Sequence, residues 1–259
     1  MFVCPNRETS LLEAYELLDG IYRLKLADEE YLTPFEFLIF AILSQRTRNA
    51  DASLAYYNLR LQFPDWEEIR LVPLKEIEHT ILSSTWPDEK ARRIQRAIEA
   101  VRSFRGGHMD LDNLYLLSTW EAGAWIERLP YVQRKTAWCV LLMSALRRPV
   151  LPVDTGYRRF AIRFGVLSPS TSWNDAHYVL QAQLPKNWDA QQIELHHNTI
   201  KKLTQTCCGA QPACYACPLR NLCAYGNRDG QDDQPSPTPP KNTWSSFQPL
   251  PGQMSLNFN

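Results

Sequence analysis

The sequence predicts an all-α protein, and three observations support this prediction. Apolar residues recur at helical spacing through most of the chain between residues 11 and 204, strand-like alternation is scarce, and two capping boxes mark helix starts. Of the 259 residues, 44% are hydrophobic, which is enough for one large core or two modest ones. No apolar run approaches membrane-spanning length, so we expect no membrane segment.

The elements follow in order. The first helix is expected around Leu11–Leu18, where apolar residues keep helical spacing. A capping box, Thr33 to Glu36 with Pro34 at the first helical position, opens a very apolar and therefore central helix. A second capping box begins at Ser118. The remaining helices are predicted over residues 49–61, 88–104, 118–128, 134–147, 155–164, 175–183 and 190–204.

The composition changes after Tyr225. The following segment holds six of the 18 prolines and has no helical period, so residues 227–259 are predicted to be a disordered tail. The N-terminus, MFVCPNRETS, lacks the pattern of a secretory signal. We therefore expect a cytoplasmic protein in a reducing compartment, where thiolates stay available for metal.

Four cysteines form the most informative pattern: Cys207, Cys214, Cys217 and Cys223, spaced C-x6-C-x2-C-x5-C. Structural zinc sites usually pair two C-x2-C knuckles across a longer gap, whereas only one C-x2-C is present here. Unequal steps suit the separate corners of a bulky cluster, so the spacing favours 4Fe–4S, with zinc as the alternative. Cys208 breaks the spacing and is interpreted as a bystander. Cys139 lies in an apolar helical run and is expected in the core.

A second motif, residues 129–137 with the sequence LPYVQRKTA, joins two predicted helices through a tight turn. Such a turn presents backbone N–H groups at a helix N-terminus, where a phosphate can bind. Lys135 falls in the first turn of the second helix, where the positive end of the dipole disfavours its protonated form. An amine with a lowered pKa can form a Schiff base. The alternative for Lys135 is a solvated surface lysine.

The third motif is the segment from Val153 to Arg159, VDTGYRR. Asp154 is predicted to be the N-cap of the helix that follows. An N-cap position keeps a carboxylate ionised, which suits a group that accepts a proton or faces a developing cation. A capping role and a chemical role are compatible here.

These three motifs, in this order, resemble the endonuclease III family of helix-hairpin-helix DNA glycosylases over residues 30–226. The family has the same cysteine spacing, a hairpin of form L-P-G-V-G-x-K-T-A and a downstream V-D-T-H. The resemblance implies an all-α, two-domain glycosylase fold. A six-helix domain is expected over residues 29–150, and an iron–sulfur domain from residues 1–28 and 151–226.

The resemblance also implies chemistry. Lys135 falls on the catalytic lysine and Asp154 on the catalytic aspartate of a bifunctional glycosylase and AP lyase. In the family a damaged pyrimidine is flipped out of the duplex. The lysine attacks C1′, expels the base and forms a Schiff base, and β-elimination then nicks the strand. The expected function is base excision repair of oxidised pyrimidines or abasic sites in double-stranded DNA.

Positions that contact DNA carry over as well. Arg46 aligns with the side chain that fills the hole left by the flipped base, with Gln45 as the alternative. Trp86 falls on the loop that wedges into the base stack, although a partly buried core tryptophan is an equal alternative. Lys90 opens a basic helix that is expected either to face DNA or to be a solvated surface. The hairpin residues Tyr131, Gln133 and Arg134 complete the predicted DNA contacts.

The chain departs from the family at several of these positions. Tyr131 and Gln133 stand where the family has glycines, so we expect a reshaped turn and a more obstructed phosphate. Gly156 replaces the histidine of V-D-T-H, and the loop from Cys207 to Cys214 contains no basic residue. These changes predict activity that is weaker or narrower than is typical of the family. The net charge of zero points the same way, since dedicated DNA-binding proteins are usually basic.

The last residues resemble the Q-L-x-L-x-F peptide by which bacterial repair proteins bind the replication sliding clamp. Its anchors would be Gln253, Met254, Leu256 and Phe258, although short motifs also match by chance. We expect a monomer associated with the bacterial nucleoid. Two alternative functions stay open: a divergent DNA-binding paralogue without turnover, and a glycosylase for another lesion such as a mismatched or alkylated base.

Overall fold

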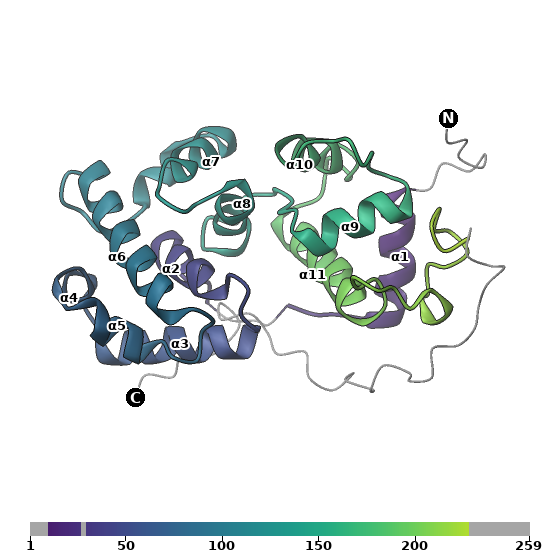
Figure 1. Ribbon diagram of the computed structural model, residues 1–259. Helices are drawn as coiled ribbons and strands as arrows, with labels where there is room; N and C mark the ends of the chain where they lie inside the picture. The colour runs from purple at the N-terminus through teal and green to yellow at the C-terminus, as the bar shows by residue number, and fades with distance from the viewer. Residues whose placement is uncertain (1–9, 27–29, 228–259) are drawn as a thin grey trace. The chain divides into compact units, whose positions relative to one another are not determined.

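The computed structural model describes residues 10–26 and 30–227, and this part of the chain is helical without any strand (Figure 1). The predicted tail and its final peptide lie outside the described residues. Among the described helices, none combines the length and the apolar character that a membrane crossing requires. The helices are α1 (Leu11–Tyr22), α2 (Pro34–Ser44), α3 (Asn49–Gln62), α4 (Trp66–Leu71), α5 (Leu74–Thr80), α6 (Pro87–Phe104), α7 (Thr119–Glu127), α8 (Arg134–Met143), α9 (Thr155–Phe164), α10 (Trp173–Gln181) and α11 (Ala190–Thr206).

The described residues form two compact units, and each is considered by itself. The first contains α2 to α8. Its centre is α2, which packs against α3, α6 and α8 and buries almost every side chain. The predicted capping box is present: the Thr33 N–H donates to Glu36 at 3.0 Å and the Glu36 N–H donates to Thr33 Oγ1 at 3.3 Å. Because each fully buried Leu or Ile contributes about 1.5–3 kcal/mol, α2 anchors this unit.

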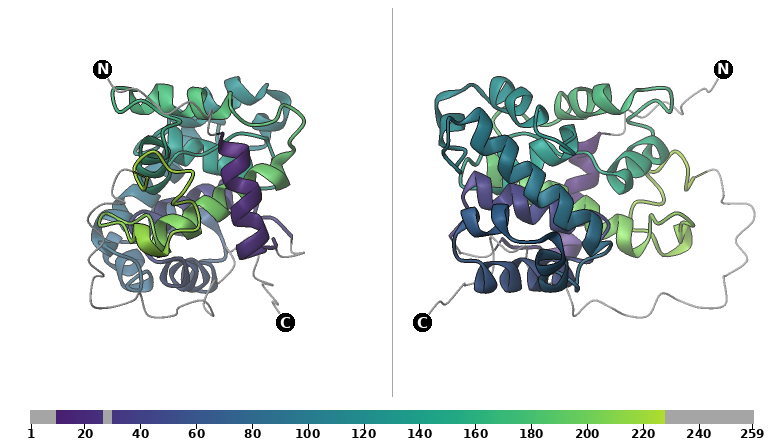
Figure 2. Two further views of the ribbon diagram at one scale, coloured as in Figure 1. Left: turned by 90° about the vertical axis from the view of Figure 1, so that its right-hand side faces the viewer. Right: turned by 60° about the vertical axis from the view of Figure 1, so that its left-hand side comes forward.

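The second unit combines α1 with α9, α10, α11 and the cysteine loop. The N-terminal helix α1 lies beside α11, as both views in Figure 2 show, and α9 packs on α11 as well. Asp189 forms a capping box with Gln192 at the start of α11. The long helix α11 then runs to Cys207, so it ends where the cysteine loop begins. Segments from both ends of the chain therefore build this unit.

Two short helices, α4 and α5, were not predicted. They contain only six and seven residues, follow Pro64 and Pro73, and carry too few apolar positions to show a period. The helix predicted over 134–147 is also shorter, because α8 ends at Met143. Arg147 takes a left-handed φ of +47° there, and the chain turns back so that the Arg148 N–H donates to the Leu141 carbonyl at 2.8 Å.

Candidate functional site

The turn between α7 and α8 keeps a conformation that favours glycine, although it contains a tyrosine. Tyr131 has φ +64°, and the Val132 N–H donates to the Leu129 carbonyl at 3.3 Å. A non-glycine residue in this region costs about 1–2 kcal/mol. Gln133, by contrast, is extended with φ −101°, so the side chain at that second position causes no backbone strain. Tyr131 therefore fits into the turn with a strained backbone, whereas Gln133 fits into it without backbone strain.

Helix α8 starts at Arg134 without a side-chain cap, so no side chain covers its N-terminus from the N-cap position. Arg134 is placed differently from its predicted role. Its guanidinium binds Glu127 of α7 through two hydrogen bonds of 3.0 and 3.3 Å, which tie the two helices of the hairpin together. The structure thus assigns this guanidinium to the hairpin itself, and the predicted DNA contact of Arg134 stays a prediction.

Lys135 and Asp154 belong to different units. Lys135 is exposed in the first turn of α8. Asp154 is the N-cap of α9, as predicted, because its Oδ1 accepts a hydrogen bond of 2.7 Å from the Tyr157 N–H. The carboxyl group is partly buried. The bond from the backbone N–H holds the carboxylate at the start of α9.

Gly156 leaves space for the neighbouring helix. A Cβ atom at this position would lie 2.8 Å from Thr204 Oγ1 of α11 and 3.2 Å from Asp154 Oδ1. Because real Cβ atoms do not approach other atoms that closely, a larger residue here would push α9 away from α11. The close approach of these helices therefore favours glycine at position 156 of this chain.

Two loops of the first unit carry residues that are predicted to contact DNA, and these loops lie side by side. Arg46 and Trp86 both have left-handed backbones, with φ +53° and +51°, and the Arg46 guanidinium lies 5.5 Å from the Trp86 ring centroid. Trp86 is 49% exposed, so its ring is partly buried but is not enclosed in the core. Strained non-glycine residues concentrate at binding sites. The two predicted side chains therefore lie against each other, and their contact with a DNA base stays a prediction.

Lys90 corrects the sequence prediction. Its side chain is only 2% exposed, and its Nζ donates to the Leu43 carbonyl at 2.6 Å and to Thr47 Oγ1. The Lys90 ammonium therefore cannot reach a DNA phosphate from this position. Burial, with a smaller effect of Arg93, lowers its pKa to about 8. The sequence did contain the signal, since Lys90 occupies the apolar stripe of α6 that continues through Ile94 and Ala97.

Thr47 connects the two loops through the same bond. Its Oγ1 also accepts the Thr85 N–H at 3.1 Å, and Thr85 Oγ1 donates to the Arg46 carbonyl at 3.0 Å. Lys90 therefore stabilises the loops that present Arg46 and Trp86. A hollow of about 390 Å³ lies beside them, and its lining consists of Gln45, Arg46, Trp86, Glu89, Lys90 and Arg93.

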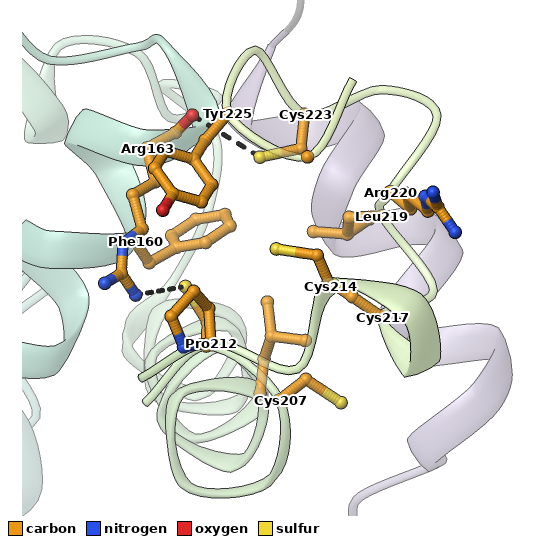
Figure 3. Close-up of a pocket in the computed structure, with 13 residues that line it drawn as sticks. Phe160, Arg163, Cys207, Pro212, Cys214, Cys217, Leu219, Arg220, Cys223 and Tyr225 are labelled. Atoms are coloured by element: carbon orange, nitrogen blue, oxygen red, sulfur yellow. Dashed lines mark hydrogen bonds between the residues drawn. The ribbon is translucent and has the colours of Figure 1, made fainter. Parts of the chain in front are cut away.

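The four predicted metal ligands line one pocket in the second unit (Figure 3). Apolar side chains, including Phe160, complete its wall. The sulfur of Cys214 points into the pocket, whereas that of Cys207 points away from it. Within the described ranges, no three metal-binding side chains converge closely enough to hold an ion. The common pocket and its all-thiol donors nevertheless fit the chemistry of a metal–sulfur centre.

Electrostatics around these cysteines show why the thiols alone are not a stable anionic site. Burial is the largest effect on Cys217 and raises its pKa to about 12, and burial also raises the pKa of Cys207. A cation that binds the sulfurs would offset this penalty, because metal ligation deprotonates thiols. Cys139 is buried in α8, as expected. Cys208 is buried beside Cys207 and also lines the pocket, so its interpretation as a bystander stays a prediction.

Two arginines that the sequence analysis did not select support the cysteine loop. Arg159 donates to the Cys208 carbonyl at 3.0 and 3.1 Å. Arg163, one turn further along α9, donates to the Gly209 carbonyl at 2.6 Å and to the Ala210 carbonyl at 2.9 Å. Their spacing of four residues put them on one helix face, but nothing in the sequence identified their partners. The segment from Cys207 to Cys214 has no basic residue of its own, and α9 supplies two to it.

The chain is similar in sequence to several known proteins. No protein-family model matches the chain. The endonuclease III of Bacillus subtilis is 28% identical over 196 residues, which cover 75% of this chain and 83% of the relative. The endonuclease III of Thermotoga maritima is 27% identical over 201 residues, 77% of this chain and 87% of the relative.

Solved structures share the fold. A structure of endonuclease III trapped as a covalent intermediate on DNA superposes with a TM-score of 0.68 at 24% identity, covering 84% of this chain and 96% of that one. A thermostable thymine-DNA glycosylase superposes with a TM-score of 0.66 at 17% identity and covers 84% and 97%. The chain is therefore similar in sequence to proteins named endonuclease III, and it shares the all-α fold of the solved helix-hairpin-helix glycosylase structures.

Proposed function

We propose that this protein is a base excision repair DNA glycosylase with AP-lyase activity on oxidised pyrimidines or abasic sites. The observation that carries the proposal is the exposed Lys135 in the first turn of α8, directly after the hairpin. An amine in this place is accessible to a substrate held at the helix N-terminus. The relatives named endonuclease III and the similar structure of a covalent DNA intermediate support the same chemistry.

The proposed reaction has three steps: displacement of the base, formation of a Schiff base and β-elimination. The neutral Lys135 amine attacks C1′ of the flipped nucleotide, and the base leaves with the electron pair of the glycosidic bond. Opening of the sugar gives a Schiff base between Lys135 and C1′. Loss of a proton from C2′ then expels the 3′ phosphate by β-elimination. In the proposed mechanism the Asp154 carboxylate stabilises the positive charge that develops on the sugar and helps to remove the proton from the attacking amine.

We further propose that Cys207, Cys214, Cys217 and Cys223 bind a 4Fe–4S cluster. Such a centre would cross-link the end of α11 to the loop after it and stabilise the small unit in which Asp154 lies. Zinc is the alternative occupant. A brown protein whose absorbance near 400 nm disappears on acid treatment, with four irons per chain by analysis, would support the cluster, while stoichiometric zinc would refute it.

Reductive trapping tests the enzyme directly. Purified, metal-loaded protein is incubated with duplexes carrying thymine glycol or an abasic site in the presence of borohydride, which reduces a Schiff base to a stable amine. We expect a covalent adduct from the wild type and none from Lys135→Ala. Lys75→Ala is the matched control, since Lys75 is an exposed lysine of the same unit, paired with Glu78 at 2.9 Å. The absence of any wild-type adduct would contradict the proposal.

A second candidate is a DNA-binding paralogue without turnover, and the strained Tyr131 in place of a glycine favours it. Binding to lesion-containing duplex without an adduct or a nick would select this candidate. Excision of a mismatched or alkylated base, without a lyase product, would select the other-lesion enzyme. The monomeric state and the nucleoid location remain proposals, which gel filtration and microscopy would test.

We also propose that the final peptide binds the replication sliding clamp through Gln253, Met254, Leu256 and Phe258. These residues lie outside the described part of the chain, so the proposal rests on the sequence pattern alone. Deletion of residues 252–259 should abolish co-elution with the clamp and leave borohydride trapping unchanged. Unchanged co-elution would refute this proposal.

A further inference from the structure

The side chain of Tyr131 links the hairpin turn to α6. The Arg96 guanidinium donates a short hydrogen bond to the Tyr131 hydroxyl, and the Arg93 guanidinium lies 5.4 Å from the centroid of its ring. Arg93 extends the network, since it donates to Gln45 Oε1 at 2.8 Å and to Glu89 at 2.8 Å. A single tyrosine therefore joins residues of the hairpin, of α6 and of the loop after α2.

The backbone of Tyr131 shows that this contact is built into the turn. Its left-handed φ of +64° is unfavourable for a residue with a Cβ atom. Such strain persists only where the surroundings over-determine the conformation. The two arginine contacts fix the ring in place, and the side chain is still 43% exposed. An exposed, held aromatic side chain at a strained position is typical of a binding surface.

The charges along α6 single out Arg96. Arg92 pairs with Asp88 at 2.8 Å, and Arg93 pairs with Glu89 at 2.8 Å. Among the described residues, no carboxylate lies within 4.0 Å of the Arg96 guanidinium, and the neighbouring Glu99 faces Arg70 at 3.5 Å instead. Arg96 is exposed. Its guanidinium is the next positive charge along α6 that could neutralise an anion. Within residues 10–26 and 30–227, the side chain that accepts a hydrogen bond from Arg96 is the uncharged hydroxyl of Tyr131.

The hydrogen bond from Arg96 leaves the Tyr131 hydroxyl as a hydrogen-bond donor. Because the Tyr131 oxygen accepts the Arg96 N–H, its own proton remains available for donation. The guanidinium has further N–H groups in a planar fork that matches a phosphate. Two donors, one of them charged, therefore point from the same place beside the hairpin turn. An oxyanion with several acceptor atoms is the ligand that satisfies both.

We propose that Tyr131 and Arg96 form a binding site for one phosphodiester of the DNA, in place of the open backbone that a glycine would leave at this turn. Tyr131 acts as a ligand and as the positioning residue for Arg96, and Arg93 holds its ring. The proposal rests on the DNA binding of the proposed function. It predicts that the tyrosine, although it departs from the family pattern, strengthens the hold on DNA instead of obstructing it.

The test is equilibrium binding of the full-length, metal-loaded protein to a duplex with a tetrahydrofuran abasic analogue, measured over a range of KCl concentrations. Arg96→Ala should raise Kd about tenfold, as expected for a charged hydrogen bond, and should flatten the slope of log Kd against log salt by about 0.9. Arg92→Ala is the matched control, because it removes the same charge four residues earlier on α6, where Arg92 is already paired with Asp88. Its effects should be clearly smaller.

Two substitutions at Tyr131 separate positioning from folding. Tyr131→Phe keeps the ring over Arg93 and removes only the hydroxyl, so it should raise Kd several-fold with little change in salt slope or thermal stability. Tyr131→Gly relieves the strain and restores the backbone that the family uses, but should bind DNA more weakly.

Each contrary result has a distinct meaning. If Tyr131→Gly binds as tightly as wild type, the backbone of the turn holds the phosphate and the tyrosine site is refuted. Equal losses in Arg96→Ala and Arg92→Ala would show a diffuse charge effect and also refute it. If the wild type binds no duplex at low salt, both this site and the proposed function fail. If every variant binds and is trapped like wild type, only the tyrosine site fails.

Discussion

The Lys90 ammonium donates a hydrogen bond of 2.6 Å to the main-chain oxygen of Leu43 and thereby joins the first turn of α6 to the end of α2. The bond crosses 47 residues of sequence and lies next to the loops that carry Arg46 and Trp86. A buried ammonium that satisfies a backbone carbonyl and the Thr47 hydroxyl is a structural anchor.

Lys90→Met should keep the volume of the side chain while leaving the Leu43 carbonyl and Thr47 without their buried donor. We expect a loss of about 1–3 kcal/mol in the free energy of unfolding by urea. DNA affinity should also fall, because the loop that presents Trp86 loses its support. Lys75→Met, at an exposed position of the same unit, is the control and should change neither quantity. An unaltered unfolding midpoint for Lys90→Met would contradict the anchoring role.

Substitutions can separate the capping role of Asp154 from its proposed chemical role. Asparagine is as good an N-cap as aspartate, so Asp154→Asn should retain the thermal stability of the protein and still lose most of its trapping activity. Asp154→Ala should lose both, with about 1 kcal/mol less stability. Thermal unfolding and adduct yield are measured on the same samples. Full activity in Asp154→Asn would show that the carboxylate has no chemical role.

Gly156→Ala should disturb the contact between α9 and α11, because its Cβ would meet Thr204 Oγ1 at 2.8 Å. Overpacking of this kind costs about 1–3 kcal/mol. Gly20→Ala is the contrasting variant: nothing lies within 4 Å of its Cβ, it is inside α1, and alanine should therefore stabilise the helix by up to about 1 kcal/mol. The double variant Gly156→Ala with Thr204→Gly should recover part of the loss. No loss in Gly156→Ala would refute the close-packing explanation.

The stability of the second unit should depend on pH through His196. This histidine is fully buried beside the Tyr157 hydroxyl at 2.7 Å, and burial, with a smaller effect of His197, lowers its pKa to about 3. Since the unfolded chain binds a proton below about pH 6.5 and the folded chain does not, stability is constant above that pH and falls below it. Between pH 7.5 and 5.5 the loss should be about 1.4 kcal/mol.

Urea unfolding of wild type and His196→Gln at both pH values measures this contribution. The variant cannot take up the proton, so its stability should fall less over the same interval. The difference between the two proteins isolates His196 from other groups that titrate in this range. Parallel pH dependences in the two proteins would contradict the burial of a neutral histidine.

Local signals in the sequence predicted the elements on which the site is built. Thr33 and Ser118 both form the predicted capping boxes, and Asp154 caps α9, because these interactions involve residues three apart. The positions of the cysteines in one pocket also followed from short spacings. Short-range chemistry of this kind can be inferred from sequence without knowledge of the fold.

Long-range partners could not be inferred in this way. Lys90 was expected on the surface because its acceptor, Leu43, lies in another helix. Arg163 was overlooked because its carbonyl partners follow 46 and 47 residues later. The turn at Tyr131 was expected to change, yet its ring contacts with α6 hold a left-handed backbone that the sequence alone disfavours. Packing between elements decides each of these cases.

The central claim is that Lys135 is the nucleophile of a DNA lyase. The most direct measurement is peptide mass mapping of the borohydride-reduced adduct formed on an abasic duplex. We predict that the added mass of the reduced sugar fragment lies on the peptide that contains Lys135 and that Lys135→Ala forms no adduct. An adduct on another lysine, or an equal yield from Lys135→Ala, would contradict the account.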